Sequence, residues 1–417
     1  MATSQLDIMN RLGRNFSALT TWIDDRFPMT KLIKEHATEY YASKNFNFWY
    51  GFGVLATVVL VLQIVTGILL TMNYKPSAAE AFASVEYIMR DVDWGWLIRY
   101  LHSTGASAFF IVVYLHMYRA MLYGSYKKPR ELIWLIGMTI YLCMMAEGFF
   151  GYLLPWGNMS YWGAQVIVSL FGVLPVVGES LAEWIRGDFY ISDITLNRFF
   201  AFHVIAVPLM LVLLVAVHIM ALHEVGSNNP DGIEIKKNKG PDGIPVDGVA
   251  FHPYHTSKDL VIILVFAILF SAVVFFAPEM GGYFLEHANF DPANTLQTPE
   301  HIAPVWYFTP FYAILRAVPN QLAGVILMGL AVMLPIFLPW LDRCKVKSIR
   351  YRGWTYKLAL TIFTISFLML GWLGLQAVTD LYTRLAQLFT VTYFLFFLAM
   401  PIYTSLEQTK PVPDRVT

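Results

Sequence analysis

Long apolar stretches alternate with shorter polar segments along the chain, and eight such stretches occur. Each holds about 20 mostly apolar residues, the length that an α-helix needs to cross the hydrocarbon core of a bilayer. Lipid offers the backbone no hydrogen-bond partner, so a spanning segment must be helical. The pattern predicts an all-α integral membrane protein with eight transmembrane helices. They lie near residues 48–73, 96–122, 132–154, 198–222, 259–278, 320–340, 358–377 and 384–404.

Composition and charge exclude several other classes of protein. Charged residues make up 14% of the 417 residues, against about 25% in soluble proteins, and the mean hydropathy is +0.53. The 29 Lys and Arg residues equal the 29 Asp and Glu residues in number, so no basic excess favours nucleic acid. Two cysteines, Cys143 and Cys344, are too few for a zinc cluster or a disulfide framework.

Loop charge predicts the orientation of the spans. Lys and Arg concentrate before the first span and after the second, fourth and sixth spans. Because positively charged loops stay in the cytoplasm, both termini are expected there. No apolar signal-peptide core lies near Met1, so the first span is expected to direct insertion.

The two long outer loops, 155–197 and 279–319, contain apolar stretches with too many Gly and Pro residues to span. We expect amphipathic surface helices there, as at 160–177, and a similar helix on the inner side at 5–23. The predicted division is a cytoplasmic N-terminal segment with a surface helix (1–47), a four-helix bundle (48–225), a cytoplasmic loop (226–258), a C-terminal four-helix region (259–405) and a tail (406–417).

Four histidines form two matched pairs inside the second and fourth spans. His102 and His116 are 14 residues apart, and His203 and His218 are 15 apart. Fourteen residues is close to four helical turns, or about 21 Å of rise. Two such helices facing each other would offer one His–His pair near each membrane surface, which suits two bis-histidine haems. The alternatives are hydrogen bonds between helices and a proton relay.

Glycines and arginines near these histidines support haem binding. Gly53 and Gly67 in the first span, and Gly137 and Gly151 in the third, repeat the 14-residue spacing. A missing side chain lets a flat ring approach the backbone, although small residues also serve plain helix packing. Arg99 and Arg119 lie one turn outside His102 and His116. They suit haem propionates, or they extend to the membrane surface for solvation.

Several sequence runs resemble cytochrome b of the bacterial-type cytochrome bc1 complex, a quinol–cytochrome c oxidoreductase. The runs are LIRYLHSTGAS at 97–107, GYLLPWGNMSYWGAQVI at 151–167, RFFAFH at 198–203, GSNNPDG at 226–232 and PVWYFTPFYAILRAVPN at 304–320. The related b6f complex divides the same unit between two chains. One continuous eight-span chain therefore favours the bc1 type.

The resemblance implies two non-covalent b-type haems in the first four spans. His102 and His203 would hold the outer, low-potential haem, and His116 and His218 the inner, high-potential haem. The residues implied as further haem contacts are Arg99, Arg119, Ser125, Asn228 and Gln63, with the glycines Gly53, Gly67, Gly137 and Gly151.

The resemblance also implies two quinone sites and a Q cycle. Ubiquinol would be oxidised at an outer site and ubiquinone reduced at an inner site, with coupled proton translocation. The outer site would include Phe150, Tyr152, Tyr307 and Tyr312; the inner site would include His223, Ser227, Lys258 and Asp259. The implied partners are a Rieske iron–sulfur protein and cytochrome c1, in a homodimeric complex of the bacterial inner membrane.

One departure from the family pattern is the 15-residue spacing of His203 and His218, where the bc1 pattern has 14. One extra residue rotates the second ligand by about 100° on an ideal helix. Pro208 lies between the two histidines and removes a backbone hydrogen bond. We therefore predict a local helix irregularity near Pro208 that absorbs the rotation.

The second departure is the outer-site motif, usually Pro-Glu-Trp-Tyr, which here has Val305 in place of Glu. Another base, or water, must then accept a quinol proton. Glu147 is the candidate, because a carboxylate inside a span is costly and by default functional. The alternative for Glu147 is a protonated side chain that hydrogen-bonds between helices. Glu300, in the outer loop, is a weaker candidate because it is expected to be solvated.

Two rival functions remain open. A secondary transporter would use the histidines as a proton relay, but the chain lacks the broken helices in symmetric halves that such folds show. A haem-b anchor of another quinone-linked dehydrogenase would have one quinone site. The motifs at 226–232 and 304–307, placed on opposite membrane faces, favour two sites.

Overall fold

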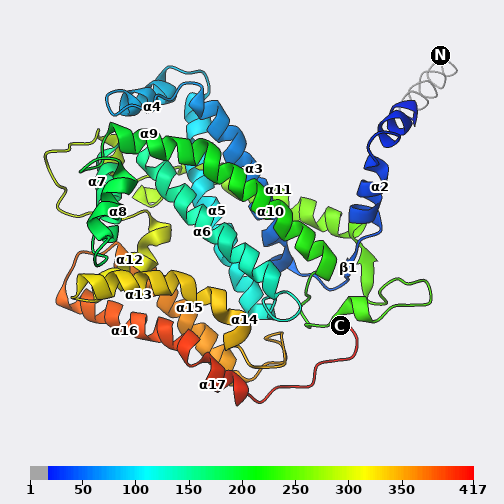
Figure 1. Cartoon of the computed structure of the whole chain (residues 1–417). Helices are drawn as coiled ribbons and strands as arrows, with labels where there is room; N and C mark the ends of the chain where they lie inside the picture. Colours follow the sequence, from blue (N-terminus) through cyan, green and yellow to red (C-terminus); the bar gives the residue numbers. More distant parts are fainter. Residues whose placement is uncertain (1–16) are drawn as a thin grey trace.

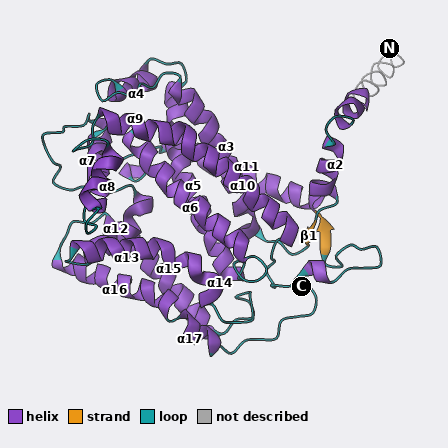
Figure 2. Ribbon diagram, viewed as in Figure 1, coloured by secondary structure: helices purple, strands orange, loops and turns teal. Residues whose placement is uncertain are grey.

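The computed structural model describes residues 17–417 and is mostly helical (Figure 1, Figure 2). The predicted surface helix at 5–23 lies largely outside these residues. Within the described part of the chain, eight helices are long and apolar enough to cross a membrane, as predicted. They are Phe48–Thr71, Gly95–Tyr123, Glu131–Leu153, Asp193–Val225, Phe251–Phe276, Gln321–Leu341, Trp354–Gly374 and Asp380–Leu398.

The first four spans form one helical group. It contains η2 (Phe48–Gly51), α3 (Phe52–Thr71), α5 (Gly95–Tyr123), α6 (Glu131–Leu153), α9 (Asp193–Ala201), η3 (Phe202–Ala206) and α10 (Val207–Val225). The closest pairings in this group are α3 with α5 and α6 with α10. Helix α11 (Thr256–Phe276), preceded by η5 (Phe251–His255), packs on α3 and α5.

The last three spans form a second group beside the first (Figure 1). Its elements are α12 (Thr309–Ala317), α13 (Gln321–Met333), η9 (Leu334–Phe337), α14 (Leu338–Leu341), α15 (Trp354–Gly374), α16 (Asp380–Leu398) and α17 (Met400–Ser405). A buried apolar cluster joins the two groups, with Phe110 of α5 packed near Phe311 and Tyr307. The Tyr114 hydroxyl donates to the Tyr307 carbonyl at 2.8 Å across this boundary.

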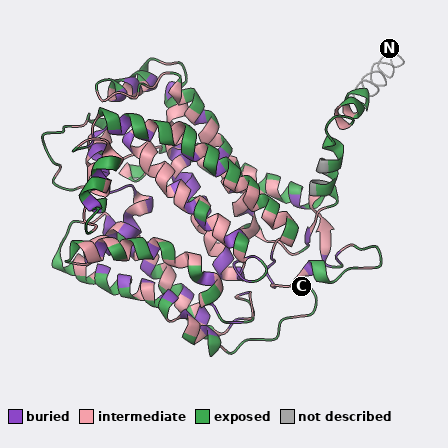
Figure 3. Cartoon of the chain, viewed as in Figure 1, coloured by how far each residue is buried: buried purple, intermediate pink, exposed green. Residues whose placement is uncertain are grey.

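Helix faces that point away from this core are apolar and exposed (Figure 3). Leu213 of α10 is 64% exposed, and Ile268 of α11 is 69% exposed. Such surface is unfavourable in water but is the expected surface of a helix in contact with lipid. The exposed apolar faces therefore agree with a membrane-spanning protein.

A π-helical turn, η3, interrupts the fourth span directly before Pro208. A π turn takes up one residue more than an α turn. It therefore absorbs the extra residue between His203 and His218 and keeps both side chains on one face of the span. The predicted irregularity near Pro208 is confirmed.

The long outer loops carry short helices, as predicted. The first contains α7 (Asn158–Phe171) and α8 (Gly178–Arg186), and the second contains η6 (Met280–Gly282), η7 (His287–Phe290), η8 (Trp306–Phe308) and the start of α12. Helix α4 (Ala81–Arg90), between the first two spans, was not predicted from the sequence.

Short elements on the predicted inner side complete the described fold. They are α2 (Met29–Ile33), η1 (Lys34–Thr38), β1 (Tyr41–Ser43), η4 (Ile235–Lys237) and β2 (Gly248–Ala250). Strands β1 and β2 pair antiparallel, with Ala42 opposite Val249, so the loop after the fourth span is joined to the segment before the first.

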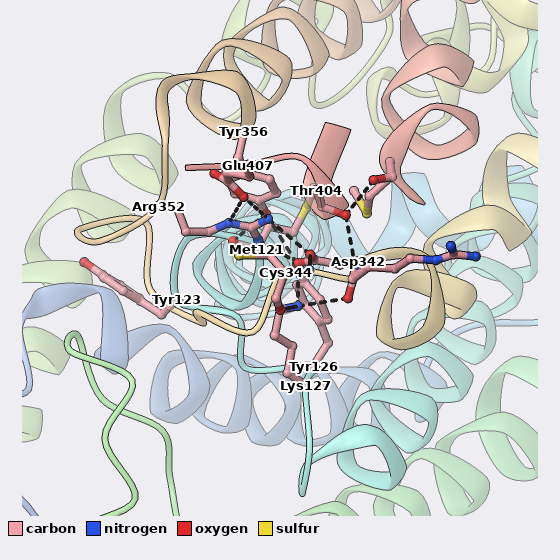
Figure 4. Close-up of polar contacts among 12 residues, drawn as sticks. Met121, Tyr123, Tyr126, Lys127, Asp342, Cys344, Arg352, Tyr356, Thr404 and Glu407 are labelled. Carbon is pink, nitrogen blue, oxygen red and sulfur yellow. Dashed lines mark hydrogen bonds and ion pairs between the residues drawn. The ribbon is translucent and has the colours of Figure 1, made fainter. Parts of the chain in front are cut away.

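A buried ionic cluster holds the two helical groups together on the same side (Figure 4). Arg352, which is 1% exposed, donates to Asp342 at 2.6 and 3.1 Å and to Glu407 at 2.8 and 3.0 Å. Lys127, from the loop after α5, lies 3.0 Å from Asp342. Burial alone would raise the pKa of Asp342, but Arg352 and Lys127 hold that pKa below its usual range.

Replacing Arg352 by methionine is expected to destabilise the fold by about 3–5 kcal/mol, because buried Glu407 loses its cation and Asp342 keeps only Lys127. Thermal unfolding of the purified protein in detergent measures the loss. Arg343→Met is the matched control, because Arg343 lies in the same loop and is exposed. Equal unfolding temperatures for Arg352→Met and the wild type would contradict the assignment.

Candidate functional site

The four histidines of the second and fourth spans form two facing pairs. The ring centres of His102 and His203 are 6.1 Å apart, with nearly perpendicular rings. Those of His116 and His218 are 6.5 Å apart. Two imidazoles that bind one metal atom from opposite sides, each at about 2 Å through nitrogen, have ring centres about 6 Å apart. The observed separations fit one metal atom within each pair.

In the outer pair, one ring nitrogen of each histidine already has a hydrogen-bond partner. His102 Nδ1 lies 2.9 Å from Thr66 Oγ1. His203 Nδ1 lies 3.0 Å from both the carbonyl oxygen and the Oε1 carboxylate oxygen of Glu147. A hydrogen bond at Nδ1 fixes the orientation of the imidazole ring and leaves Nε2 to bind a metal. The structure thus places Glu147 against a candidate haem ligand.

The four predicted glycines each face one of the four histidine rings. A Cβ atom added to Gly53, Gly67 or Gly137 would lie 3.3, 3.3 or 3.2 Å from the ring of His116, His102 or His218. At Gly151 an added Cβ would overlap the ring of His203. The absence of a side chain at each glycine therefore leaves room for the four histidine rings beside α3 and α6.

Three polar residues predicted near the inner pair, Arg119, Ser125 and Asn228, lie close to one another. Arg119 donates to Ser125 Oγ at 3.1 Å, and Asn228 Nδ2 lies 3.4 Å from the same oxygen. The Arg119 guanidinium lies over the ring of Tyr50 at 4.6 Å. Among the described residues its Nε atom has no hydrogen-bond partner. A buried donor without a partner fits an anionic group such as a haem propionate.

The outer pair has fewer polar neighbours. Arg99 lies one turn before His102 on α5. Gln63 of α3 packs against Gly105 of α5, one turn after His102. Its buried Nε2 atom has no hydrogen-bond partner among the described residues.

The predicted outer-site residues divide into three places. Phe150 packs on Phe202, beside the outer histidine pair, with ring centres 5.3 Å apart. Tyr312 donates to the Ile302 carbonyl at 3.1 Å. Tyr152 and Tyr307 both lie near Glu286. Burial is the main cause that raises the pKa of Tyr307, and the charge of Glu286 raises it further.

Glu286 is a site residue that sequence reasoning missed. The Tyr152 hydroxyl donates to Glu286 Oε2, and Asn289 Nδ2 donates to the Tyr152 hydroxyl at 3.0 Å. Burial raises the pKa of Glu286 to about 7, partly offset by the Tyr152 hydrogen bond. The only sequence signal was a carboxylate within an apolar stretch of the outer loop, and its partner lies 134 residues away.

Two of the four predicted inner-site residues, His223 and Ser227, contact Tyr40 of the N-terminal segment. His223 stacks on Tyr40 with ring centres 4.3 Å apart, and Tyr40 also contacts the Ser227 backbone. Lys258 lies over the Tyr254 ring at 4.5 Å, next to Asp259 in the first turn of α11. Sequence reasoning missed Tyr40. Burial raises the pKa of Tyr40, so its hydroxyl group stays protonated and can donate a hydrogen bond.

Arg130 positions the loop that carries Ser227 and Asn228. Its Nε atom donates to the Gly226 carbonyl at 2.8 Å, and its two terminal nitrogens donate to Glu234 at 2.7 and 2.9 Å. Burial would raise the pKa of Glu234, but Arg130 and Lys347 lower it to about 2. The pair therefore stays charged and holds the loop at the start of α6.

Fold and site together define an all-helical, eight-span membrane protein whose paired histidines fit bound haem. The Cytochrome b/b6/petB family model matches residues 37–226, and the Cytochrome b(C-terminal)/b6/petD model matches residues 292–394. The chain therefore belongs to the cytochrome b/b6 family. Membership implies binding of b-type haem, interaction with quinone and a role in electron transport.

Two relatives and one solved structure are similar over nearly the whole chain. Cytochrome b of Allochromatium vinosum is 64% identical over 405 residues, which cover 95% of this chain and 98% of that protein. Cytochrome b of Rickettsia prowazekii is 47% identical and covers 96% and 98%. A chain of a hyperthermophilic respiratory Complex III superposes with a TM-score of 0.86 at 38% identity, covering 93% and 99%. The chain is thus of the bc1, or Complex III, type.

Proposed function

We propose that this chain is the di-haem subunit of a quinol–cytochrome c oxidoreductase that works by a Q cycle. The observation that carries the proposal is the pair of facing histidine pairs, with ring centres 6.1 and 6.5 Å apart. Each pair would hold one b-type haem, and the two bound haems would supply one-electron transfer between an outer and an inner quinone site. His102 and His203 would hold the outer, low-potential haem, and His116 and His218 the inner, high-potential haem.

Two haems suit the thickness of the membrane. The ligands on α5 are 14 residues apart, or about 21 Å along the helix, which divides the crossing into two shorter steps. Two axial histidines leave a haem iron no open position for oxygen. Electron transfer is therefore favoured over gas binding, and Arg119, Ser125 and Asn228 would bind the propionates of the inner haem.

The quinone sites would exchange protons on opposite sides of the membrane. At the outer site, Phe150, Tyr152, Tyr307 and Tyr312 would bind ubiquinol. At the inner site, His223 and Asp259 would donate protons to ubiquinone, Ser227 would orient it, and Lys258 would bring protons from the cytoplasm. Protons would leave outside and enter inside, so that electron transfer charges the membrane.

Partner subunits would complete the reaction. The two cysteines of the chain, 201 positions apart, supply neither a covalent haem motif nor an iron–sulfur cluster. A Rieske protein would accept one electron from quinol, and cytochrome c1 would carry it onward. The likeness to a Complex III chain supports these partners. The complex would be a homodimer of a bacterial inner membrane, and the distribution of Lys and Arg among the loops favours both termini in the cytoplasm.

An optical redox titration of the purified protein, with a haem count per chain, tests the proposal. Two b-type haems that titrate at separate potentials are expected. One haem per chain would favour the anchor of another quinone-linked dehydrogenase. A folded protein without haem would favour the alternative in which the histidines form a proton relay.

A further inference from the structure

We propose that Glu286 is the proton acceptor of the outer quinol site. It would take the place of the motif Glu, at whose position this chain has Val305. The inference rests on the proposed function and adds one catalytic residue to it. Glu286 lies in the outer loop between the fifth and sixth spans, at the start of η7, and the Val305 motif lies 19 residues further along the same loop.

The first support is the fixed position of the Glu286 carboxylate at the end of α6. It accepts a hydrogen bond from the Tyr152 hydroxyl and lies 3.4 Å from Asn289 Nδ2. Asn289 is itself held by the backbone N–H of Ser160, which donates to its Oδ1 atom at 2.7 Å. The loop is further fixed by the Ala293 N–H, which donates to the Trp156 carbonyl at 3.0 Å.

The second support is that two of the three predicted outer-site tyrosines, Tyr152 and Tyr307, lie near this carboxylate. Tyr152 donates to it directly, and Tyr307 lies close enough for the Glu286 charge to act on its hydroxyl. The ring of Tyr307 is fixed by stacking on Phe110, with centres 3.8 Å apart. Val305, only two residues earlier, is 5% exposed and supplies no base.

The third support is electrostatic. Burial raises the pKa of Glu286 to about 7, so that the carboxyl group exchanges protons near neutral pH. The ionisable groups that face it are the Tyr152 and Tyr307 hydroxyls. The adjacent His287 is exposed and lies 3.9 Å from Glu279. Within residues 17–417, no cationic side chain forms an ion pair with Glu286 that would hold it permanently charged.

Glu147, the candidate from the sequence, occupies a different place. Its carboxylate faces the Nδ1 atom of His203, a candidate haem ligand, and is therefore suited to orienting that ring. Glu286 is bound to the quinol-site tyrosine instead. The geometry divides the two carboxylates between a positioning role and a proton-accepting role.

The chemistry of the step balances within the proposed function. Oxidation of one quinol to quinone breaks two O–H bonds and releases two protons and two electrons. The two electrons would go one each to the iron–sulfur partner and the outer b-type haem of the proposed function. Glu286 takes one of the two protons, directly or through the Tyr152 hydroxyl, and becomes a carboxylic acid, while the other proton passes to water at the outer face. It then releases that proton to the outer solvent.

Glu286→Gln in the assembled complex tests the proposal through quinol-dependent reduction of cytochrome c from about pH 5 to pH 9. The wild-type rate should rise with pH as Glu286 loses its proton near pH 7. The variant should be about 10- to 100-fold slower at neutral pH and lack that inflection. Its haem spectrum should be unchanged.

Three further variants make the result specific. Asp291→Asn, an exposed carboxylate in the same loop, should keep the wild-type rate and pH profile. Glu147→Gln should shift the potential or spectrum of the outer haem more than the pH profile. Adding Val305→Glu to Glu286→Gln should restore part of the lost rate, because it returns a carboxylate to the family position.

The outcomes separate the two proposals. A wild-type complex without quinol-dependent cytochrome c reduction would overturn the proposed function itself. An active wild type, with a Glu286→Gln variant of equal rate and equal pH profile, would overturn only the role of Glu286. Loss of the haem spectrum in both Glu286→Gln and Glu286→Asp would assign the residue a structural role and also overturn it.

Discussion

Replacing His203 with leucine is expected to remove the outer haem and leave the inner one in place. The proposed outer site has two axial ligands, with ring centres 6.1 Å apart, and leucine offers no lone pair to a metal. The inner pair lies about four turns away along the same helices. The haem count should fall from two to one per chain, and only the higher-potential component should remain in an optical redox titration.

His218→Leu is the reciprocal variant and should remove only the higher-potential component. His301→Leu is the matched control, since His301 is an exposed histidine of the outer loop. Quinol-dependent reduction of cytochrome c should cease in both ligand variants. Two haems in His203→Leu at unaltered potentials would contradict the ligand assignment.

The spans and the histidine pairs were predictable from the sequence because each depends on local periodicity. Twenty apolar residues in a row have one stable form in lipid, and a 14-residue spacing places two side chains on one helix face without knowledge of the neighbouring helices. Even the π turn before Pro208 was predictable, because one extra residue between His203 and His218 requires a local change of helical pitch.

The contacts between distant segments were not predictable from the sequence. Glu286 meets Tyr152 only because the outer loop folds back over the end of α6, and no local pattern encodes that approach. The cluster around Arg352 is similar, since its partners Asp342 and Glu407 come from separate loops. Glu147 was recognised because a carboxylate buried inside a span is energetically costly. That cost alone does not identify the neighbouring group that stabilises the carboxylate.

Replacing Gly151 with valine is expected to reduce haem binding more than the same change at Gly53, Gly67 or Gly137. An added Cβ would overlap the His203 ring, and α6 packs closely on α10, so the ring or the helix must move. Overpacking of this kind costs about 1–3 kcal/mol, and the displaced ring loses its alignment with His102. Haem content and redox titration should show reduced occupancy of the lower-potential component.

The extent of the effect should follow the space beside each glycine. Gly137→Ala should be milder, because its Cβ would lie 3.2 Å from the His218 ring, a contact that a small shift relieves. Gly329→Val in α13 is the control, since nothing lies within 4 Å of an added Cβ there, and it should keep both haems. Equal haem content in Gly151→Val and Gly329→Val would show that the glycines serve helix packing alone. A graded loss, confined to the haem nearest each substitution, would support glycines that leave room for each histidine ring to hold its haem.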